Sequence, residues 1–196
     1  RDPEMSRGLG DVYKRQVLTV DGAYKAADFI NFCDAYDIPV LSLTNVKGYA
    51  ADVRSEKSIA KAVAKLTYAF ANANVPKVNV ITGEAYGSAY VTMNSKALGA
   101  DVTYAWPDAS IGMMDANEAA KIMYADDIAK SADVQSVISE KAAEYAALQS
   151  GVESAAARGY VDTIINPEDT RKYVAAAFEM LYTKREDRPD KKHGTV

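Results

Sequence analysis

The stretch that decides the fold is Val78-Asn79-Val80-Ile81-Thr82-Gly83-Glu84-Ala85-Tyr86-Gly87-Ser88-Ala89-Tyr90-Val91-Thr92-Met93. Its β-branched beginning, bounded by Gly83, predicts a short buried strand followed by a tight turn. The small residues Gly87, Ser88 and Ala89 then enter a helix, whose first N–H groups lack a partner within the helix. Donors of this kind stabilise a developing anion. Alternatively, the small residues serve only to let a helix pack tightly on a strand.

Working outward from this stretch, strands and helices alternate along the chain. Apolar runs predict strands over residues 38–43, 102–106 and 160–165, with a possible strand end at 17–20 and a short apolar segment at 110–114. Helical periodicity covers residues 22–36, 55–73, 116–124, 134–150 and 171–183, and a helix through Tyr90 is expected to end at Gly99. This alternation predicts an α/β fold with parallel strands.

The composition is that of one globular domain with a single core. The chain has 196 residues, of which 48% are hydrophobic and 26% charged. A net charge of -4 provides no basic face for nucleic acid. The single cysteine, Cys33, and the single histidine, His193, allow no internal disulfide and no His/Cys zinc cluster. No apolar run approaches the ~20 residues that span a bilayer. We therefore expect a cytoplasmic protein without membrane insertion, nucleic acid or metal in this domain.

Residues 1–16 have neither helical nor strand periodicity and contain two glycines. The run Ser6-Arg7-Gly8-Leu9-Gly10-Asp11-Val12-Tyr13-Lys14-Arg15-Gln16 is similar to translated adapter sequence. We interpret residues 1–16 as a non-native leader, so that residues 17–196 are a fragment of a longer chain.

Several motifs follow one another in a fixed order. They include residues 27–40, Ala64-Lys65-Leu66, Val75-Pro76-Lys77-Val78, Ala85-Tyr86-Gly87-Ser88-Ala89-Tyr90, Tyr104-Ala105-Trp106-Pro107, residues 159–165 and Lys191-Lys192-His193-Gly194. Together they resemble the C-terminal half of the carboxyltransferase subunits of biotin-dependent acetyl-, propionyl- and methylmalonyl-CoA carboxylases, with their transcarboxylase and decarboxylase relatives. The resemblance implies the crotonase (ClpP-like) fold, with repeated β-β-α units and helices packed around a mainly parallel sheet. It also implies that residues 17–196 are the C-terminal, biotin-side domain.

In that family, biotin's ureido oxygen is held by two backbone N–H groups at a helix start, and no protein nucleophile is needed. The matching donors here are the N–H groups of Ser88 and Ala89, next to Gly87. The resemblance also implies a set of residues around the cofactor and the acyl group, namely Gly48, Tyr49, Tyr86 and Tyr90 for cofactor binding and Val91 for substrate selection.

This chain departs from the family pattern at three places. Ser88 replaces the second of two glycines, which a backbone donor tolerates provided that the φ angle stays negative. Lys47 replaces the proline of a Val-Pro-Gly-Phe turn, and Lys61-Ala62-Val63 replaces Arg-His-Gly.

The implied activity is carboxyl transfer between carboxybiotin and a short-chain acyl-CoA, and the fragment alone is expected to be inactive. The implied partners are a biotin carboxyl carrier protein, biotin carboxylase or decarboxylase subunits, the upstream carboxyltransferase domain and further copies in a homo-oligomer. One alternative is a biotin-independent crotonase-type hydratase or isomerase, which ought to show a side-chain acid or base in its cleft. A noncatalytic crotonase-fold assembly domain is the other alternative.

Other conspicuous residues have simple interpretations. We expect Cys33 to be a small buried hydrophobe, and Asp126, Asp127 and Asp133 to form a solvated acidic surface. Met113 and Met114 are expected in the core rather than in an acyl pocket. His193 belongs to a basic tail and is not expected to be a catalytic base.

Overall fold

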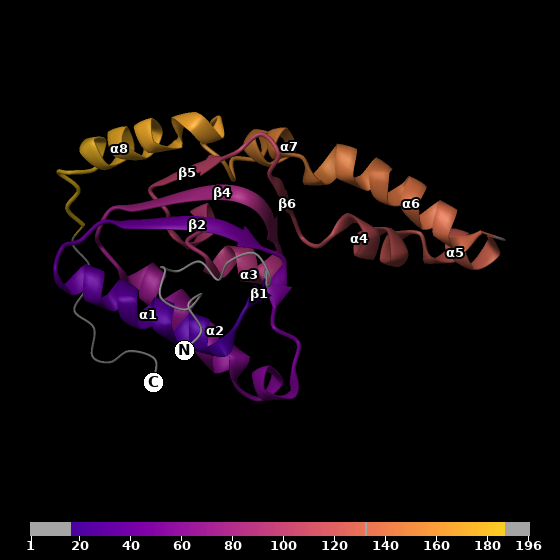
Figure 1. The fold of residues 1–196 in the computed structure, drawn as a ribbon, viewed down its shortest axis with the longest axis horizontal. Helices are drawn as coiled ribbons and strands as arrows, with labels where there is room; N and C mark the ends of the chain where they lie inside the picture. Colours follow the sequence, from indigo (N-terminus) through magenta and orange to yellow (C-terminus); the bar gives the residue numbers. More distant parts are fainter. Residues whose placement is uncertain (1–16, 132, 187–196) are drawn as a thin grey trace.

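A parallel β-sheet forms the centre of the protein in the computed structural model, which describes residues 17–131 and 133–186 (Figure 1). The strands are β2 (Val40–Val46), β4 (Lys77–Tyr86), β5 (Val102–Ala105), β6 (Ser110–Gly112) and β7 (Thr163–Ile164). Their order is β2-β4-β5-β7, and β6 pairs with the carboxyl end of β4. All of these pairs are parallel, as are β1 (Val17–Leu18) and β3 (Gly48–Tyr49), which form a small second sheet. The predicted α/β architecture with parallel strands is confirmed.

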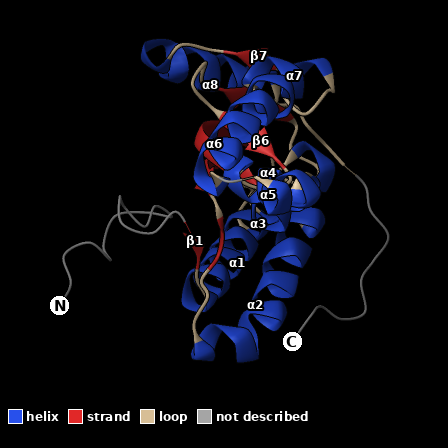
Figure 2. Ribbon diagram, turned by 90° about the vertical axis from the view of Figure 1, so that its right-hand side faces the viewer, coloured by secondary structure: helices blue, strands red, loops and turns tan. Residues whose placement is uncertain are grey.

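Helices cover both faces of the main sheet (Figures 1 and 2). On one face, α1 (Val20–Ala35) packs against α2 (Val53–Asn72) through buried alanines such as Ala27 and Ala62, which let the two helices approach closely. Cys33 is 2% exposed in this layer, so its predicted role as a small buried hydrophobe is confirmed. On the other face, α8 (Thr170–Met180) buries Val174 and Ala177 against β4 and β5.

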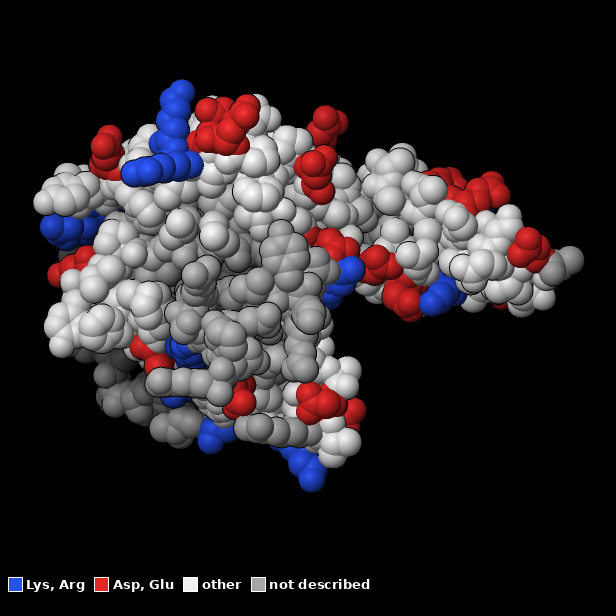
Figure 3. All heavy atoms as spheres, viewed as in Figure 1, with Lys and Arg blue, Asp and Glu red and all other residues white. Residues whose placement is uncertain are grey.

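Three helices project from the body as an arm, which we define as residues 116–131 and 133–145 (Figures 1 and 3). They are α4 (Ala116–Met123), α5 (Ala125–Lys130) and α6 (Val134–Tyr145). A π-helical turn (Ala146–Ser150) and α7 (Val152–Ala157) lead from the arm back to the sheet. Asp126, Asp127 and Asp133 are exposed on the arm, as predicted. Met113 is 76% exposed where the arm begins, so its predicted burial in the core is wrong.

Some element boundaries differ from the prediction. β4 continues past Gly83 to Tyr86, because Glu84, Ala85 and Tyr86 still pair with β6. The helix that follows, α3 (Gly87–Thr92), ends early. Asn94, two residues later, has a φ angle of 57°, which does not continue a right-handed helix, and a 3-10 turn (Lys96–Leu98) takes up the rest of the predicted helix. The leader-like residues 1–16 and the tail with His193 lie outside the described residues. No helix in the described part of the chain is long and apolar enough to cross a membrane.

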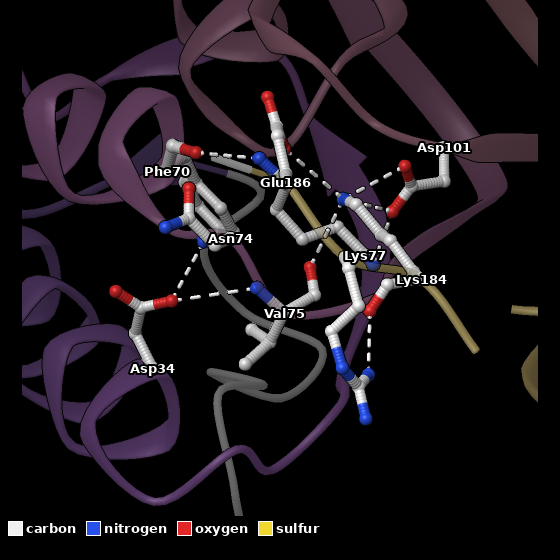
Figure 4. Close-up of polar contacts among 9 residues, drawn as sticks. Asp34, Phe70, Asn74, Val75, Lys77, Asp101, Lys184 and Glu186 are labelled. Carbon is white, nitrogen blue, oxygen red and sulfur yellow. Dashed lines mark hydrogen bonds and ion pairs between the residues drawn. The ribbon is translucent and has the colours of Figure 1, made fainter. Parts of the chain in front are cut away.

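Polar contacts fasten the amino-terminal ends of the strands (Figure 4). The Nζ of Lys77, at the start of β4, donates a 2.8 Å hydrogen bond to the carbonyl oxygen of Phe70, in the last turn of α2. The backbone N–H of Lys77 donates to the Asp101 carboxylate at 2.8 Å, and the Lys184 Nζ lies 2.9 Å from the same carboxylate. We call Lys77, Asp101 and Lys184 the amino-end clamp.

Replacement of Asp101 by asparagine is expected to lower the free energy of unfolding by about 2 kcal/mol. The Asp101 and Lys184 side chains are only 19% and 14% exposed, so water screens their attraction weakly. Urea unfolding measures the effect, with Asp28→Asn as the matched control. Asp28 pairs with Lys65 at 3.0 Å but is 68% exposed, and its loss should cost less than about 0.5 kcal/mol. Equal unfolding midpoints for the two variants would contradict a stabilising clamp.

Candidate active site

The carboxyl end of β4 turns directly into α3 at Gly87. Gly87 has a φ angle of 59°, and a Cβ atom placed there would lie 3.0 Å from the Met113 carbonyl oxygen. Glycine suits this position because both the backbone angle and the space disfavour a side chain. Ser88 is not among the residues with positive φ, so the condition for tolerating serine there is met. A left-handed residue followed by helical residues makes a concave group of N–H donors, and we call Gly87, Ser88 and Ala89 the amide cradle.

The amide cradle has donors available for an oxygen ligand. Among the described residues, no backbone hydrogen bond outside the elements themselves uses the N–H groups of Ser88 or Ala89. Ser88 is exposed, whereas Ala89 is 1% exposed. Since α3 has only six residues, the local amides contribute more than a long helix dipole would. Two adjacent N–H groups can therefore meet one developing oxyanion.

The exposed face of α3 carries the predicted substrate-selecting residue. Val91 is 40% exposed and lies three positions after Ser88, so the two residues share one side of the helix. Ala89 and Tyr90 point inward to a core cluster that also contains Ile81 and Ile111. A ligand bound at Ser88 would thus lie close to Val91.

Tyr90, a predicted cofactor-binding residue, is mostly enclosed in the protein. Its side chain is 7% exposed, and its hydroxyl has no hydrogen-bond partner in the part of the chain that is described. Burial, with a smaller contribution from Tyr160, raises the pKa of Tyr90 from 10.0 to about 12. The position in the core is that of a packing residue, and contact with a cofactor stays a prediction.

Tyr90→Phe is expected to raise the free energy of unfolding at pH 7 by about 1 kcal/mol, because it removes a buried hydroxyl without a partner. The raised pKa has no effect on stability below pH 10, but because the unfolded state ionises first, stability is lost as pH rises from 10 toward 12, by about 1.4 kcal/mol per pH unit. Unfolding followed from pH 7 to 12 should show this loss in the parent and a smaller loss in the variant. Tyr182→Phe, at an 81% exposed site, is the control and should change stability by less than about 0.5 kcal/mol. Parallel pH curves for parent and Tyr90→Phe would contradict the assignment.

Tyr86, immediately before the amide cradle, makes a polar contact that the sequence does not reveal. Its side chain is 6% exposed, and its hydroxyl donates a 2.9 Å hydrogen bond to the Ser110 Oγ. Ser110 in turn donates to the Ser150 carbonyl oxygen at 3.3 Å. Burial raises the pKa of Tyr86, while the Ser110 hydrogen bond opposes this shift. The phenol is therefore neutral and fixed in direction at neutral pH.

The turn at Gly48 and Tyr49 lies next to α3, as the resemblance implies. β3 packs against α3, and Tyr49 packs against the core cluster that contains Ala89 and Tyr90. A Cβ atom at Gly48 would have nothing within 4 Å, which leaves open space beside its backbone. The structure therefore brings the predicted turn residues close to α3.

An ion pair holds this turn to β4 at Lys47, the position where the resemblance implies a proline. The Lys47 Nζ lies 3.0 Å from the Glu84 carboxylate, and this hydrogen bond raises the Lys47 pKa. Glu84 also donates its N–H to the Asn45 side-chain oxygen at 3.0 Å. Glu84 and Asn45 were not predicted as site residues, because nothing in their local pattern marks them. In the described part of the chain, no group of three or more His, Cys, Asp or Glu residues is placed to hold a metal ion.

Comparison with known proteins places these observations in context. The model of the carboxyl transferase domain family matches residues 14–196. A putative propionyl-CoA carboxylase beta chain from Bacillus subtilis is 50% identical over 180 residues, covering 91% of this chain and 36% of that protein. The methylmalonyl-CoA carboxyltransferase 12S subunit of Propionibacterium freudenreichii is 43% identical over 178 residues, which cover 90% of this chain and 34% of that subunit.

A solved structure agrees with these sequence matches. The crystal structure of transcarboxylase 12S, described as a hexamer assembly with methylmalonyl-coenzyme A and methylmalonic acid bound, superposes with a TM-score of 0.86. It is 42% identical, over 91% of this chain and 34% of that chain. The present chain thus spans about a third of the length of these relatives.

Proposed function

Because the chain belongs to the carboxyl transferase domain family, we propose that it forms the biotin-side half of an active site that transfers a carboxyl group between biotin and a short-chain acyl-CoA. The observation that carries this proposal is the amide cradle, with two available N–H donors directly after the carboxyl end of β4. Ligands of parallel sheets bind at this end of the strands.

The residues present fit the cofactor that the family implies. Biotin, when bound, would supply the carboxyl group that is transferred. The N–H groups of Ser88 and Ala89 would hold its ureido oxygen, and such donors are typically worth ~2.7–4 kcal/mol each in a transition state. Gly87 sets the direction of these N–H groups. The open space beside Gly48 would let the neighbouring turn approach the biotin ring. No protein nucleophile is needed in this arrangement.

Substrate choice follows from the exposed side of α3. Val91 offers an apolar surface beside Ser88, which suits a small acyl chain of the acetyl, propionyl or methylmalonyl type. The tyrosines lie on the inner side of this site: Tyr90 is buried on α3, Tyr86 is buried directly before it, and Tyr49 packs against the core cluster that contains Tyr90.

The complete enzyme needs further parts. We propose that an upstream carboxyltransferase domain contributes the acyl-CoA side, and that a biotin carboxyl carrier protein and a biotin carboxylase or decarboxylase subunit complete the reaction in a cytoplasmic homo-oligomer. The structurally similar transcarboxylase 12S is described as a hexamer and as a multienzyme core, which supports this proposal. The isolated 196-residue chain is expected to be inactive.

Carboxyl exchange by the full-length protein tests the proposed function. The purified protein is given free carboxybiotin and, in turn, acetyl-CoA, propionyl-CoA and butyryl-CoA, and labelled carboxyl transfer is measured. We expect transfer to at least one short acyl-CoA. Biotin-independent hydration or isomerisation of an enoyl-CoA, with no carboxyl transfer to any of the three, would overturn the proposal.

A further inference from the structure

A chain of hydroxyl groups connects the residue before the amide cradle to the base of the arm. The Tyr86 hydroxyl donates to the Ser110 Oγ at 2.9 Å, and the Ser110 hydroxyl donates to the Ser150 carbonyl oxygen at 3.3 Å. Tyr86 lies on β4, Ser110 on β6 and Ser150 in the π-helical turn, so three separate segments meet at Ser110. Ser110 is the middle member of these hydrogen bonds, since its hydroxyl accepts from Tyr86 and donates to Ser150.

The backbone around Ser110 also touches the amide cradle. Gly112, two residues later on β6, pairs with Tyr86, and the Met113 carbonyl oxygen is the atom closest to a Cβ placed at Gly87. Ser110 forms an antiparallel bridge with Gly151, directly after the π-helical turn. A shift of β6 would therefore move the Met113 carbonyl oxygen, which lies beside Gly87.

We propose that Ser110 is a positioning residue for the amide cradle, an inference that rests on the proposed carboxyl transfer. Its hydroxyl fixes the side chain of Tyr86, and through the Tyr86–Gly87 peptide it fixes the direction of the Ser88 and Ala89 N–H groups. Ser110 does not touch the reacting atoms itself. Oxyanion donors act only when they are aimed before the charge develops, and a misplacement of about 1 Å can cost about a hundredfold in rate.

Removal of the Ser110 hydroxyl should lower the turnover number and leave the affinity for the substrate nearly unchanged. In the full-length protein, Ser110→Ala is expected to lower kcat about tenfold and to leave the KM for acyl-CoA within about twofold. Ser110→Thr keeps the hydroxyl and should recover most of kcat, since Ser110 lines a surface depression of about 570 Å³ and is not enclosed on all sides. Ser154→Ala is the matched control. Ser154 lines the same depression, but its hydroxyl makes only a 3.4 Å hydrogen bond to the Leu148 carbonyl oxygen.

A double-mutant cycle separates positioning from general packing. Tyr86→Phe and Ser110→Ala interrupt the same hydrogen bond, so the double variant should lose little more kcat than either single variant. Independent, multiplicative losses would overturn the proposed chain from Ser110 through Tyr86.

A second measurement decides the matter even without turnover. Hydrogen–deuterium exchange of the peptide covering residues 84–93, in the full-length protein, should be about tenfold faster in Ser110→Ala than in the parent, Ser110→Thr or Ser154→Ala. If the parent transfers no carboxyl group to any acyl-CoA, the proposed function falls, while this exchange pattern still supports positioning of the amide cradle. Unchanged exchange in Ser110→Ala overturns the inference, whatever the activity of the parent.

Discussion

Ser88→Pro is expected to lower carboxyl exchange by the full-length protein by at least about a hundredfold. Proline has no N–H, so the variant loses one of the two donors of the amide cradle. Removal of one such donor typically costs about 10²- to 10³-fold in kcat. Proline is tolerated in the first turn of a helix, and Ser88 is the second residue of α3. Steady-state exchange between carboxybiotin and the preferred acyl-CoA measures the effect.

The matched control for this variant is Ser88→Ala. Alanine keeps the N–H and removes only the exposed hydroxyl, so turnover should stay within about threefold of the parent. Thermal unfolding of both variants establishes that they are folded at the assay temperature. A folded Ser88→Pro enzyme with parental turnover would rule out the Ser88 N–H as an oxyanion donor, and a strong loss in Ser88→Ala would point to the hydroxyl instead.

Gly87→Ala should impair both stability and catalysis. At a φ angle of 59° an alanine costs about 1–2 kcal/mol, and its Cβ would lie 3.0 Å from the Met113 carbonyl oxygen. Relief of that contact requires a backbone shift at Gly87 or at Met113, beside the amide cradle. We therefore expect a loss of about 1–3 kcal/mol in the free energy of unfolding and a fall of at least about tenfold in kcat.

Gly159→Ala separates the two effects. Gly159 also has a positive φ angle, 81°, but a Cβ there meets nothing within 4 Å, and the residue lies after α7, outside the proposed active site. The Gly159→Ala variant should lose a similar amount of free energy of unfolding and keep the parental kcat. Equal losses of kcat in the two variants would show that the lower turnover of Gly87→Ala comes from general destabilisation.

The architecture was largely predictable from local patterns. Alternating apolar runs and helices predicted an α/β fold with parallel strands, and the crotonase-type carboxyltransferase resemblance is confirmed by the family match and by the transcarboxylase structure. The ends of elements were less predictable, because they depend on distant pairing. β4 extends to Tyr86 only because β6 pairs with it, and a single positive φ angle at Asn94 accompanies the early end of α3.

Some residues of the candidate site could likewise be predicted from local sequence, and others could not. Gly87, Ser88 and Ala89 were recognisable as small residues between a strand and a helix, and the structure shows the backbone angle that makes Gly87 suitable. Ser110 and Glu84 carry no such signal, since their roles come from contacts with residues 24 and 37 positions away. The functional roles of Gly48, Tyr49, Tyr86, Tyr90 and Val91 stay predictions.

The amino-end clamp has a consequence for the order of folding. Lys184 reaches Asp101 across 83 residues and the Val75 carbonyl oxygen across 109 residues. Contacts with such long sequence separation require the closure of a long loop, and their entropic cost delays them until nearer elements have assembled. We expect the clamp to be absent from the folding transition state. The Asp101→Asn variant should then refold at nearly the parental rate and unfold faster, so the clamp extends the lifetime of the native state instead of directing the chain toward it.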